Sequence, residues 1–376
     1  MKILLVMEQY DNGNNGTTIS AQRFAGALRQ RGHEVRVLTS GEPGTDKYAL
    51  PVLHFLPLAD SIIRSQGMQF AVPKRTTIEE AVRWAELVHF MMPFNLSRAA
   101  YRVAQEQHKP CTAAFHVQPE NITSTLHLGH SQAVNELLYT EFRDKFYNKF
   151  THIHCPSAFI ADQLRRHGYT AKLHVISNGV APRFCYRRLP KEPQLAGKYA
   201  VLMIGRLSEE KRQDVLIDAV ARSRHEAQIQ LILAGQGPRR AALEKRAAGL
   251  TNPPIFGFYD ADRLCDIIAM SDLYVHAADV EIEAIACIEA FACGLVPVIA
   301  ASALSATPQF ALDSRSLFTA GDPAALAEKM DWWLEHPAER ERMGRAYAQS
   351  ASQYRLEASI EKAEAMFREA LAESGR

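Results

Sequence analysis

The chain has 376 residues, of which 47% are apolar and 23% are charged, and its formal net charge is +1. This length exceeds what one hydrophobic core usually organises, so we expect two domains with the composition of a globular enzyme. The sequence has no apolar run long enough to span a membrane, and its opening KILLVM is too short for a signal peptide, which predicts a cytoplasmic protein.

Charge and cysteine usage narrow the possible partners. Residues 1–190 carry 22 basic and 15 acidic side chains, whereas residues 191–376 carry 21 and 27. The imbalance indicates either a compositional difference between two domains or an anionic partner for the N-terminal half; we expect no nucleic-acid partner. The six cysteines show no CxxC spacing, which predicts buried free thiols and neither a disulfide frame nor a metal site.

Strand and helix patterns alternate along the first half. A strand at 2–7 is followed by a glycine-rich loop, a helix within 19–35 and a strand at 36–40, and further strands are predicted at 87–92, 111–117, 152–157 and 173–179. Alternating units of this kind predict a parallel sheet with helices on both faces. We predict a first α/β domain over residues 1–181.

The proline-rich stretch that follows has no clear period and predicts a linker over residues 182–198. The alternation then restarts with strands at 199–206, 229–235, 254–259, 273–278 and 296–300, which predicts a second α/β domain over residues 199–350. Residues 351–376 form a predicted amphipathic helix, with packing back onto the first domain as one option. Two similar α/β domains place the expected site in a cleft, at the carboxyl ends of the strands.

Glycine-rich loops follow three predicted strands. Gly16 ends the loop after the first strand, although a plain turn explains Asn-Gly sequences equally well. In the second domain, Arg206 and Lys211 flank a loop where a guanidinium and an ammonium could share a diphosphate, the alternative being a solvated loop with local ion pairs. Gly235 lies in a third such loop. Three loops at equivalent strand ends favour a binding edge.

Two further segments place polar residues at strand ends. His116 ends an apolar strand and is followed closely by Gln118, Glu120 and Asn121, which favours a cleft position over a satisfied core histidine. Glu281 lies before, and Glu289 within, a predicted short helix rich in small and apolar residues. Such a helix offers backbone amides for phosphate at positions 283–285 and carboxylates for hydroxyl groups.

These residues resemble a known family. Glu281-x7-Glu289 followed by EAFACGLVPVIA is similar to the E-x7-E signature of retaining glycosyltransferases, particularly glycosyltransferase family 4. GRLSEEK, SNGV, LAGQGP and IFGF resemble the other motifs of that family, and the resemblance covers essentially the whole chain. It implies an α/β GT-B fold, in which two Rossmann-like domains with parallel sheets face each other across a cleft.

The resemblance also implies a role for each matching position. Arg206 and Lys211 would neutralise the donor diphosphate, Glu281 would accept hydrogen bonds from the donor sugar, and His116 would touch that sugar. Donor binding would further involve the loop and base-pocket positions Gly16, Gly235, Phe256 and Gly257, and the helix positions Glu283, Ala284, Ile285 and Glu289. The chain departs from the family where Glu283-Ala284 replaces the usual Phe-Gly, which leaves the identity of the sugar open.

The expected function is retaining transfer of a hexose from a nucleotide diphosphate sugar, such as UDP-glucose, to an acceptor hydroxyl. The alternatives are a GT-B nucleotide-sugar 2-epimerase and a non-catalytic nucleotide-sugar-binding protein. We expect no metal or other cofactor, because no DxD-like pair stands at a strand end and basic residues could stabilise the leaving group.

The acceptor is suggested by residues 58–74, where apolar side chains are flanked by Arg64, Lys74 and Arg75. Such a pattern suits an anionic membrane surface, and a core-packed loop with a basic edge explains it equally well. A lipid or glycolipid acceptor and peripheral membrane binding are therefore hypotheses, and the sequence does not indicate an oligomeric state.

Overall fold

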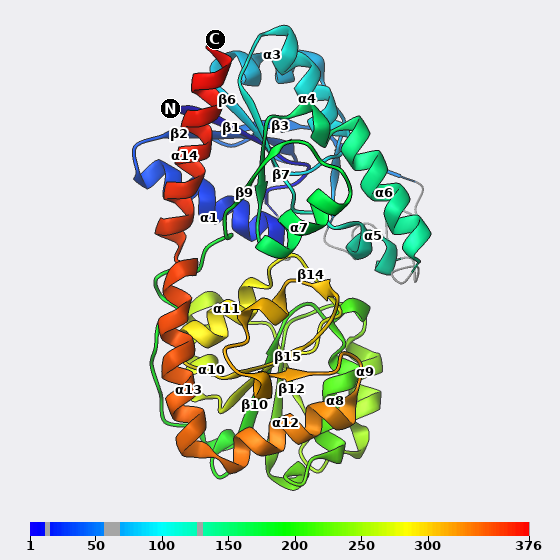
Figure 1. Ribbon diagram of the computed structural model, residues 1–376, viewed down its shortest axis with the longest axis vertical. Coiled ribbons are helices and arrows are strands. Elements are labelled where there is room, and N and C mark those ends of the chain that lie inside the picture. The colour runs from blue at the N-terminus through cyan, green and yellow to red at the C-terminus, as the bar shows by residue number, and fades with distance from the viewer. Residues whose placement is uncertain (12–15, 56–67, 126–130, 376) are drawn as a thin grey trace. The chain divides into compact units, whose positions relative to one another are not determined.

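The computed structural model describes residues 1–11, 16–55, 68–125 and 131–375, which form two compact units. The first unit contains residues Met1–Gly179 and Leu356–Arg376, and the second contains Val180–Arg355. Each unit is an α/β sandwich built on a parallel sheet (Figure 1). The expectation of two Rossmann-like α/β domains with parallel sheets is thus confirmed.

The sheet of the first unit has the strand order β3-β2-β1-β6-β7-β8-β9, and every neighbouring pair is parallel. Its strands are β1 (Lys2–Val6), β2 (Glu34–Ser40), β3 (Lys47–Leu50), β6 (Leu87–Phe90), β7 (Cys111–Ala114), β8 (His152–Cys155) and β9 (Lys172–Val175). A small antiparallel pair joins β4 (Val52–Leu53) to β5 (Phe70–Ala71). The α-helices among the described residues of this unit are α1 (Gly16–Gln30), α3 (Arg75–Trp84), α4 (Asn95–Glu106), α5 (Pro119–Thr125), α6 (Gln132–Lys145), α7 (Ala158–Arg166) and α14 (Leu356–Ser374).

The sheet of the second unit has the order β12-β11-β10-β13-β15-β17, again parallel throughout. Its strands are β10 (Tyr199–Ile204), β11 (Ile229–Ala234), β12 (Ile255–Gly257), β13 (Leu273–His276), β15 (Pro297–Ala300) and β17 (Leu317–Phe318), and β14 (Val280–Glu281) pairs separately with β16 (Leu304–Ser305). Its helices are α8 (Gln213–Arg222), α9 (Arg240–Arg246), α10 (Ala261–Met270), α11 (Ile285–Ala292), α12 (Pro323–Glu335) and α13 (Pro337–Ser350).

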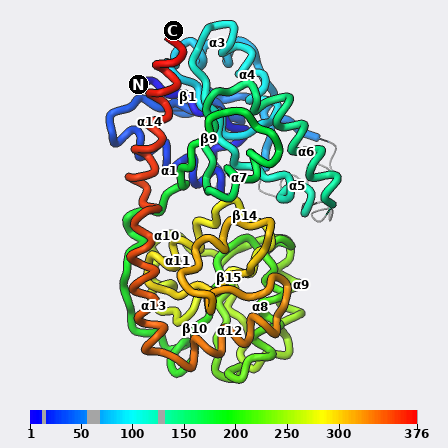
Figure 2. Tube along the Cα trace, viewed as in Figure 1, coloured from blue at the N-terminus to red at the C-terminus, as the bar shows by residue number. Residues whose placement is uncertain are grey.

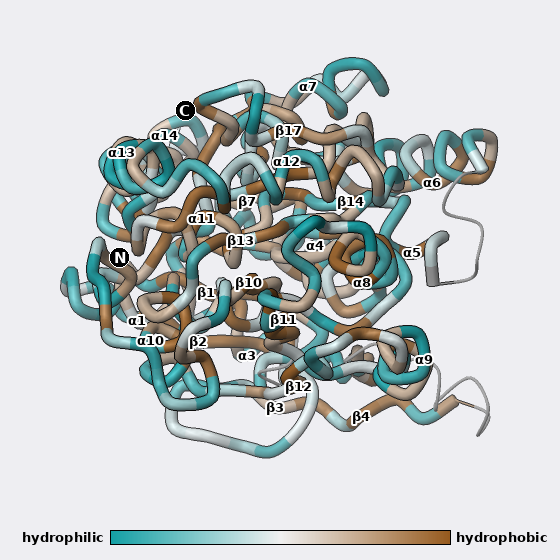
Figure 3. Tube along the Cα trace, turned by 90° about the horizontal axis from the view of Figure 1, so that it is seen from below, coloured by the Kyte–Doolittle hydropathy of each residue, from teal (hydrophilic) through white to brown (hydrophobic). Residues whose placement is uncertain are grey.

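The central strands are continuous apolar runs because helices cover both faces of each sheet. Every residue of β11 is buried, and Figure 3 shows β10 and β11 coloured as hydrophobic. Among the described residues, no helix is long and apolar enough to cross a membrane.

The last helix, α14, belongs to the first unit although it follows the second unit in the sequence. It packs beside α1, as Figure 2 shows, and its Glu364 accepts hydrogen bonds from Arg31 at 2.7 and 3.1 Å. Gly179, where the chain leaves the unit, has a φ of +79°, and a Cβ there would lie 2.8 Å from the backbone of Leu356. Glycine is therefore required at this crossing point.

Residues 182–198, expected as a linker, lie within the second unit. Arg188 donates to the carbonyl oxygens of Ser271 and Gly294, and Lys191 donates to Asp272. The side chains of Arg188 and Lys191 thus hold this segment on the rest of the second unit.

Candidate functional site

The glycine loops of the second unit converge at the carboxyl ends of β10, β11 and β12. The backbone N–H of Gly205 donates to Ala234 at 3.0 Å, and that of Gly235 donates to Gly257 at 2.7 Å. A Cβ on Gly235 would lie 1.9 Å from the carbonyl oxygen of Gly205. Gly235 is thus required for loop packing, whether or not a ligand approaches it.

Arg206 and Lys211 both lie in the segment between β10 and α8. Arg206 contacts Glu210 at 3.5 Å, and Ser208 donates to the same carboxylate at 2.5 Å. Lys211 forms an ion pair with Glu281. The structure therefore brings two cations to one edge of the sheet, each with an acidic neighbour.

Glu281 is fixed by its backbone and by both neighbours of its carboxylate. It ends the short strand β14, ahead of the helix as expected, and its carbonyl oxygen accepts from the N–H of Ala306 at 2.8 Å. Its carboxylate contacts Lys211 and lies 3.2 Å from Nε2 of His276.

Burial alone would raise the pKa of the Glu281 carboxyl group, but the charge of Lys211 and the hydrogen bond from His276 outweigh burial and lower the pKa to about 2. The group is therefore ionised at neutral pH. It is suited to accept hydrogen bonds from hydroxyl groups and unsuited to donate a proton.

Helix α11 carries the second glutamate of the signature. Glu289 lies in the middle of the helix and is buried, as is Glu283 just before it. Ala284, the N-cap, has the left-handed φ of +63°, and Ile285 begins the helix. The position where the resembled family has glycine thus needs a positive φ, which alanine adopts only with strain.

The expected base pocket has its own internal contacts. The guanidinium of Arg240 lies 5.5 Å from the ring centroid of half-buried Phe256. A Cβ on Gly257 would lie 2.1 Å from the ring of Tyr259, so this glycine also has a packing role.

Sequence reasoning missed His276 and the ion pair of Arg212 with Asp279. His276 ends β13, and the hydroxyl oxygen of Tyr274 lies 3.1 Å from Nδ1 of His276. The guanidinium of Arg212 donates to the carboxylate of Asp279 at 2.8 Å, and the backbone of Arg212 has a left-handed φ of +55°. His276 could have been found from the sequence, because it is a histidine at a strand end like His116. The contact of Arg212 with Asp279 could not, because the two residues lie 67 positions apart and only the tertiary fold brings them together.

His116 follows β7 in the first unit and is 4% exposed. Its ring meets that of His154 edge-on with centroids 5.1 Å apart, and Nε2 has no hydrogen-bond partner among the described residues. Burial, followed by the proximity of His154 and His89, lowers its pKa well below the ordinary value. A neutral ring with an unused nitrogen is suited to bind a hydroxyl group.

Residues 12–15 of the loop that ends at Gly16 lie outside the described residues, and Gly16 itself begins α1. Within the described part of the chain, a Cβ on Gly16 would meet nothing within 4 Å. Packing in that part therefore does not require glycine at this position. Glu120, one of the polar residues that follow His116, accepts a hydrogen bond from the hydroxyl group of Tyr139 at 3.2 Å.

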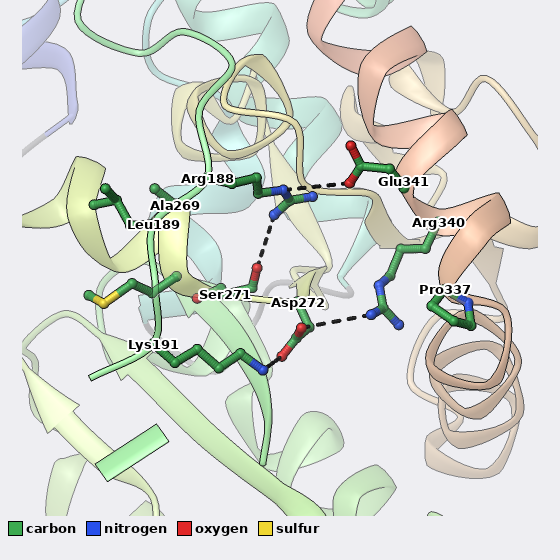
Figure 4. Close-up of a pocket in the computed structure, with 10 residues that line it drawn as sticks. Arg188, Leu189, Lys191, Ala269, Ser271, Asp272, Pro337, Arg340 and Glu341 are labelled. Atoms are coloured by element: carbon green, nitrogen blue, oxygen red, sulfur yellow. Dashed lines mark hydrogen bonds and ion pairs between the residues drawn. The ribbon is translucent and has the colours of Figure 1, made fainter. Parts of the chain in front are cut away.

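A cavity of about 290 Å³ lies at the amino end of β13, the opposite end of that strand from His276 (Figure 4). Its charged side chains already pair with one another: Arg188 lies 3.9 Å from Glu341, and Asp272 contacts both Lys191 and Arg340. These contacts hold residues 182–198 in place and do not extend the candidate donor site.

Comparison with known proteins assigns both halves of the chain. The sequence model described as "Glycosyltransferase Family 4" matches residues 14–184, and that described as "Glycosyl transferases group 1" matches residues 187–350. The chain belongs to the family 4 glycosyltransferases of the GT-B fold. This glycosyltransferase is therefore an enzyme, as expected.

Individual relatives are distant. The alpha-monoglucosyldiacylglycerol synthase of Streptococcus pneumoniae is 22% identical over 321 residues, which cover 80% of this glycosyltransferase and 71% of the relative. A GDP-mannose-dependent alpha-(1-6)-phosphatidylinositol dimannoside mannosyltransferase of Mycobacterium tuberculosis is 28% identical over 215 residues, 55% of each chain. The crystal structure of Anabaena HepE with UDP and glucose has a TM-score of 0.73 at 18% identity, covering 98% of this chain and 100% of HepE.

Proposed function

We propose that this glycosyltransferase moves a hexose from a UDP-sugar, such as UDP-glucose, to a hydroxyl group of a membrane lipid or glycolipid, with retention of configuration. The observation that supports binding of a nucleotide-sugar donor is the ionised Glu281 beside Lys211 and His276 at the carboxyl edge of the second sheet. Such a carboxylate can orient sugar hydroxyls, while Lys211 and Arg206 can hold a diphosphate.

The proposed chemistry needs no separate base. The bond between the anomeric carbon and the β-phosphate oxygen breaks, and the electron pair leaves with UDP, whose charge Arg206 and Lys211 would stabilise. The acceptor oxygen then bonds to the anomeric carbon from the same face, and its proton passes to the departing phosphate. Retention is proposed from family resemblance, and His116 is proposed to bind a sugar hydroxyl through its neutral ring.

Two distant relatives support a lipid acceptor, because their names specify a diacylglycerol and a phosphatidylinositol product, each α-linked. The chain's own support is limited to the edge of the residue 58–74 segment, since residues 58–67 lie outside the described part. Phe70 packs edge-on against Phe94 at 5.4 Å, while Val72 is 40% exposed beside Lys74 and Arg75. Phe70 thus favours the core-packed interpretation, and Val72 favours the membrane-facing one.

The test incubates the full chain with UDP-glucose and, in parallel, GDP-mannose, each with phosphatidylglycerol vesicles that contain or lack diacylglycerol. We expect release of UDP only when the acceptor lipid is present, with the hexose recovered in the lipid phase, and co-flotation of the protein with the vesicles that weakens as salt is raised. Conversion of UDP-glucose to another UDP-sugar would instead support the 2-epimerase. Transfer without vesicle binding, to a water-soluble acceptor, would overturn the lipid half of the proposal.

A further inference from the structure

Two histidines and two glutamates meet where strands β8 and β9 pack against helix α14 in the first unit. His152 is the first residue of β8 and His174 lies in β9, while Glu369 and Glu373 are one helical turn apart on α14. His152 lies at the amino end of its strand, whereas His116 follows the carboxyl end of the neighbouring β7. The cluster is therefore separate from the residues considered for sugar binding.

The hydrogen bonds of His152 define which of its nitrogens can act as a ligand. Its Nε2 lies 3.0 Å from a carboxylate oxygen of Glu373, and its Nδ1 lies 2.9 Å from Nε2 of His174. Because a carboxylate only accepts, a neutral His152 carries its proton on Nε2. The Nδ1 lone pair then points at His174.

This arrangement is the one that metal-binding histidines use. A ligand histidine commonly donates its other ring N–H to a carboxylate, which fixes the tautomer and the ring orientation. One ligand atom each from His152, His174 and Glu369 lie within 4.8 Å of one another. Tetrahedral zinc with ligands at about 2.0–2.2 Å holds them about 3.3–3.6 Å apart, so modest side-chain rotations would bring the three ligand atoms to these separations.

We propose that His152, His174 and Glu369 bind a divalent transition metal of the zinc class, with water as the fourth ligand and Glu373 as the positioning residue for His152. Two imidazoles and one carboxylate suit zinc, cobalt and nickel and do not suit magnesium or calcium. The metal would join two strands to a helix about 200 positions later in the chain, and so fasten α14 to its sheet.

Lys172 opposes metal binding in a way that can be measured. Its ammonium forms an ion pair with Glu369, so it must release that carboxylate before a metal can bind it. If the cluster binds a metal, removing Lys172 should therefore tighten metal binding. If the cluster is held together only by its own ion pairs, removing Lys172 should weaken it. The two explanations thus predict opposite effects of the same substitution.

The test is calorimetric titration of the chelator-treated full chain with zinc chloride, and with cobalt chloride for an optical signal. We expect one tight site that raises the melting temperature. His174→Ala and Glu369→Gln should abolish it, and Glu373→Gln should weaken it by about 10- to 100-fold. Lys172→Gln should tighten it. His108→Asn, which changes an exposed histidine outside the cluster, should leave it unchanged.

Equal zinc affinity in the wild type, His174→Ala and Glu369→Gln would overturn the proposal and indicate adventitious binding elsewhere. Absence of a tight site in the wild type would also overturn it. If His174→Ala does not fold, Glu369→Gln decides, because it alters only a half-exposed helical side chain and no strand residue. Neither readout depends on sugar transfer.

Discussion

The ammonium of Lys211 and the carboxylate of Glu281 form an ion pair between residues 70 positions apart, joining the segment before α8 to strand β14. Each charge is thus partly satisfied by the other. A bound diphosphate would draw on Lys211, and sugar hydroxyls would then donate to Glu281. The pair accordingly links the two parts of the donor that the proposed function requires.

Replacing either basic residue should slow the reaction strongly. We expect Arg206→Ala and Lys211→Ala each to reduce turnover by roughly 100- to 1,000-fold, the scale of one lost transition-state charge contact. Steady-state UDP release measures the effect. Lys245→Ala, which removes an exposed lysine at the end of α9, is the control and should retain wild-type turnover. Lys211→Ala within threefold of the control would remove Lys211 from the mechanism.

Glu281→Gln should separate catalysis from donor binding. The amide keeps one acceptor oxygen but loses the charge, so we expect kcat to fall by more than the affinity for UDP. Kinetics and calorimetric titration with UDP give the two quantities. The matched control is Glu328→Gln, an exposed glutamate on α12. Near-normal turnover in Glu281→Gln would show that this carboxylate does not act on the sugar.

Much of this architecture follows from local sequence pattern. Apolar strand runs such as IQLILA alternate with helical periods, so both parallel sheets could be predicted, and with them the edge where Arg206 and Glu281 lie. Whether those residues bind a donor stays a prediction. The return of α14 to the first unit was one option from the sequence and could not be decided there, because it depends on contacts such as that between Arg31 and Glu364, 333 positions apart.

Pairings of very short strands were equally beyond prediction. β14 and β16 contain two residues each, so backbone hydrogen bonds and not a hydrophobic pattern decide their register. The His152–His174–Glu369 cluster likewise has no local spacing signal, because its members come from two strands and the last helix.

The contact between α1 and α14 should depend on pH. Hydrogen bonding from Arg31, together with that from His33, lowers the pKa of Glu364 to about 2 from an ordinary 4.5 despite its burial. A lowered folded-state pKa means that the stabilisation is complete above about pH 4.5 and is lost as the pH falls towards 2.

Glu364→Gln should therefore lower the melting temperature at pH 7 by about 2–4 °C, and the difference from wild type should shrink on acidification. Glu361→Gln, on the same helix but 65% exposed at its side chain, should change little at any pH. A difference between Glu364→Gln and wild type that did not vary between pH 7 and pH 3 would contradict the assigned pKa.

Ala284 should tolerate glycine better than its helical neighbours do. Its left-handed φ of +63° costs an alanine about 1 kcal/mol, so Ala284→Gly should leave stability unchanged or raise it by up to about that amount. Ala286→Gly, inside α11, should instead lower stability by about 1 kcal/mol. Urea unfolding of both variants provides the comparison, and equal losses would argue against strain at Ala284.

The most direct test of the proposed reaction is the anomeric configuration of the product formed from UDP-glucose and diacylglycerol vesicles. Proton NMR of the extracted lipid reports it through the coupling between H1 and H2 of the transferred sugar. The account predicts the small coupling of an α-glucoside, with one UDP released for each glycolipid formed. A β-linked glycolipid, or consumption of UDP-glucose without any glycolipid, would contradict it.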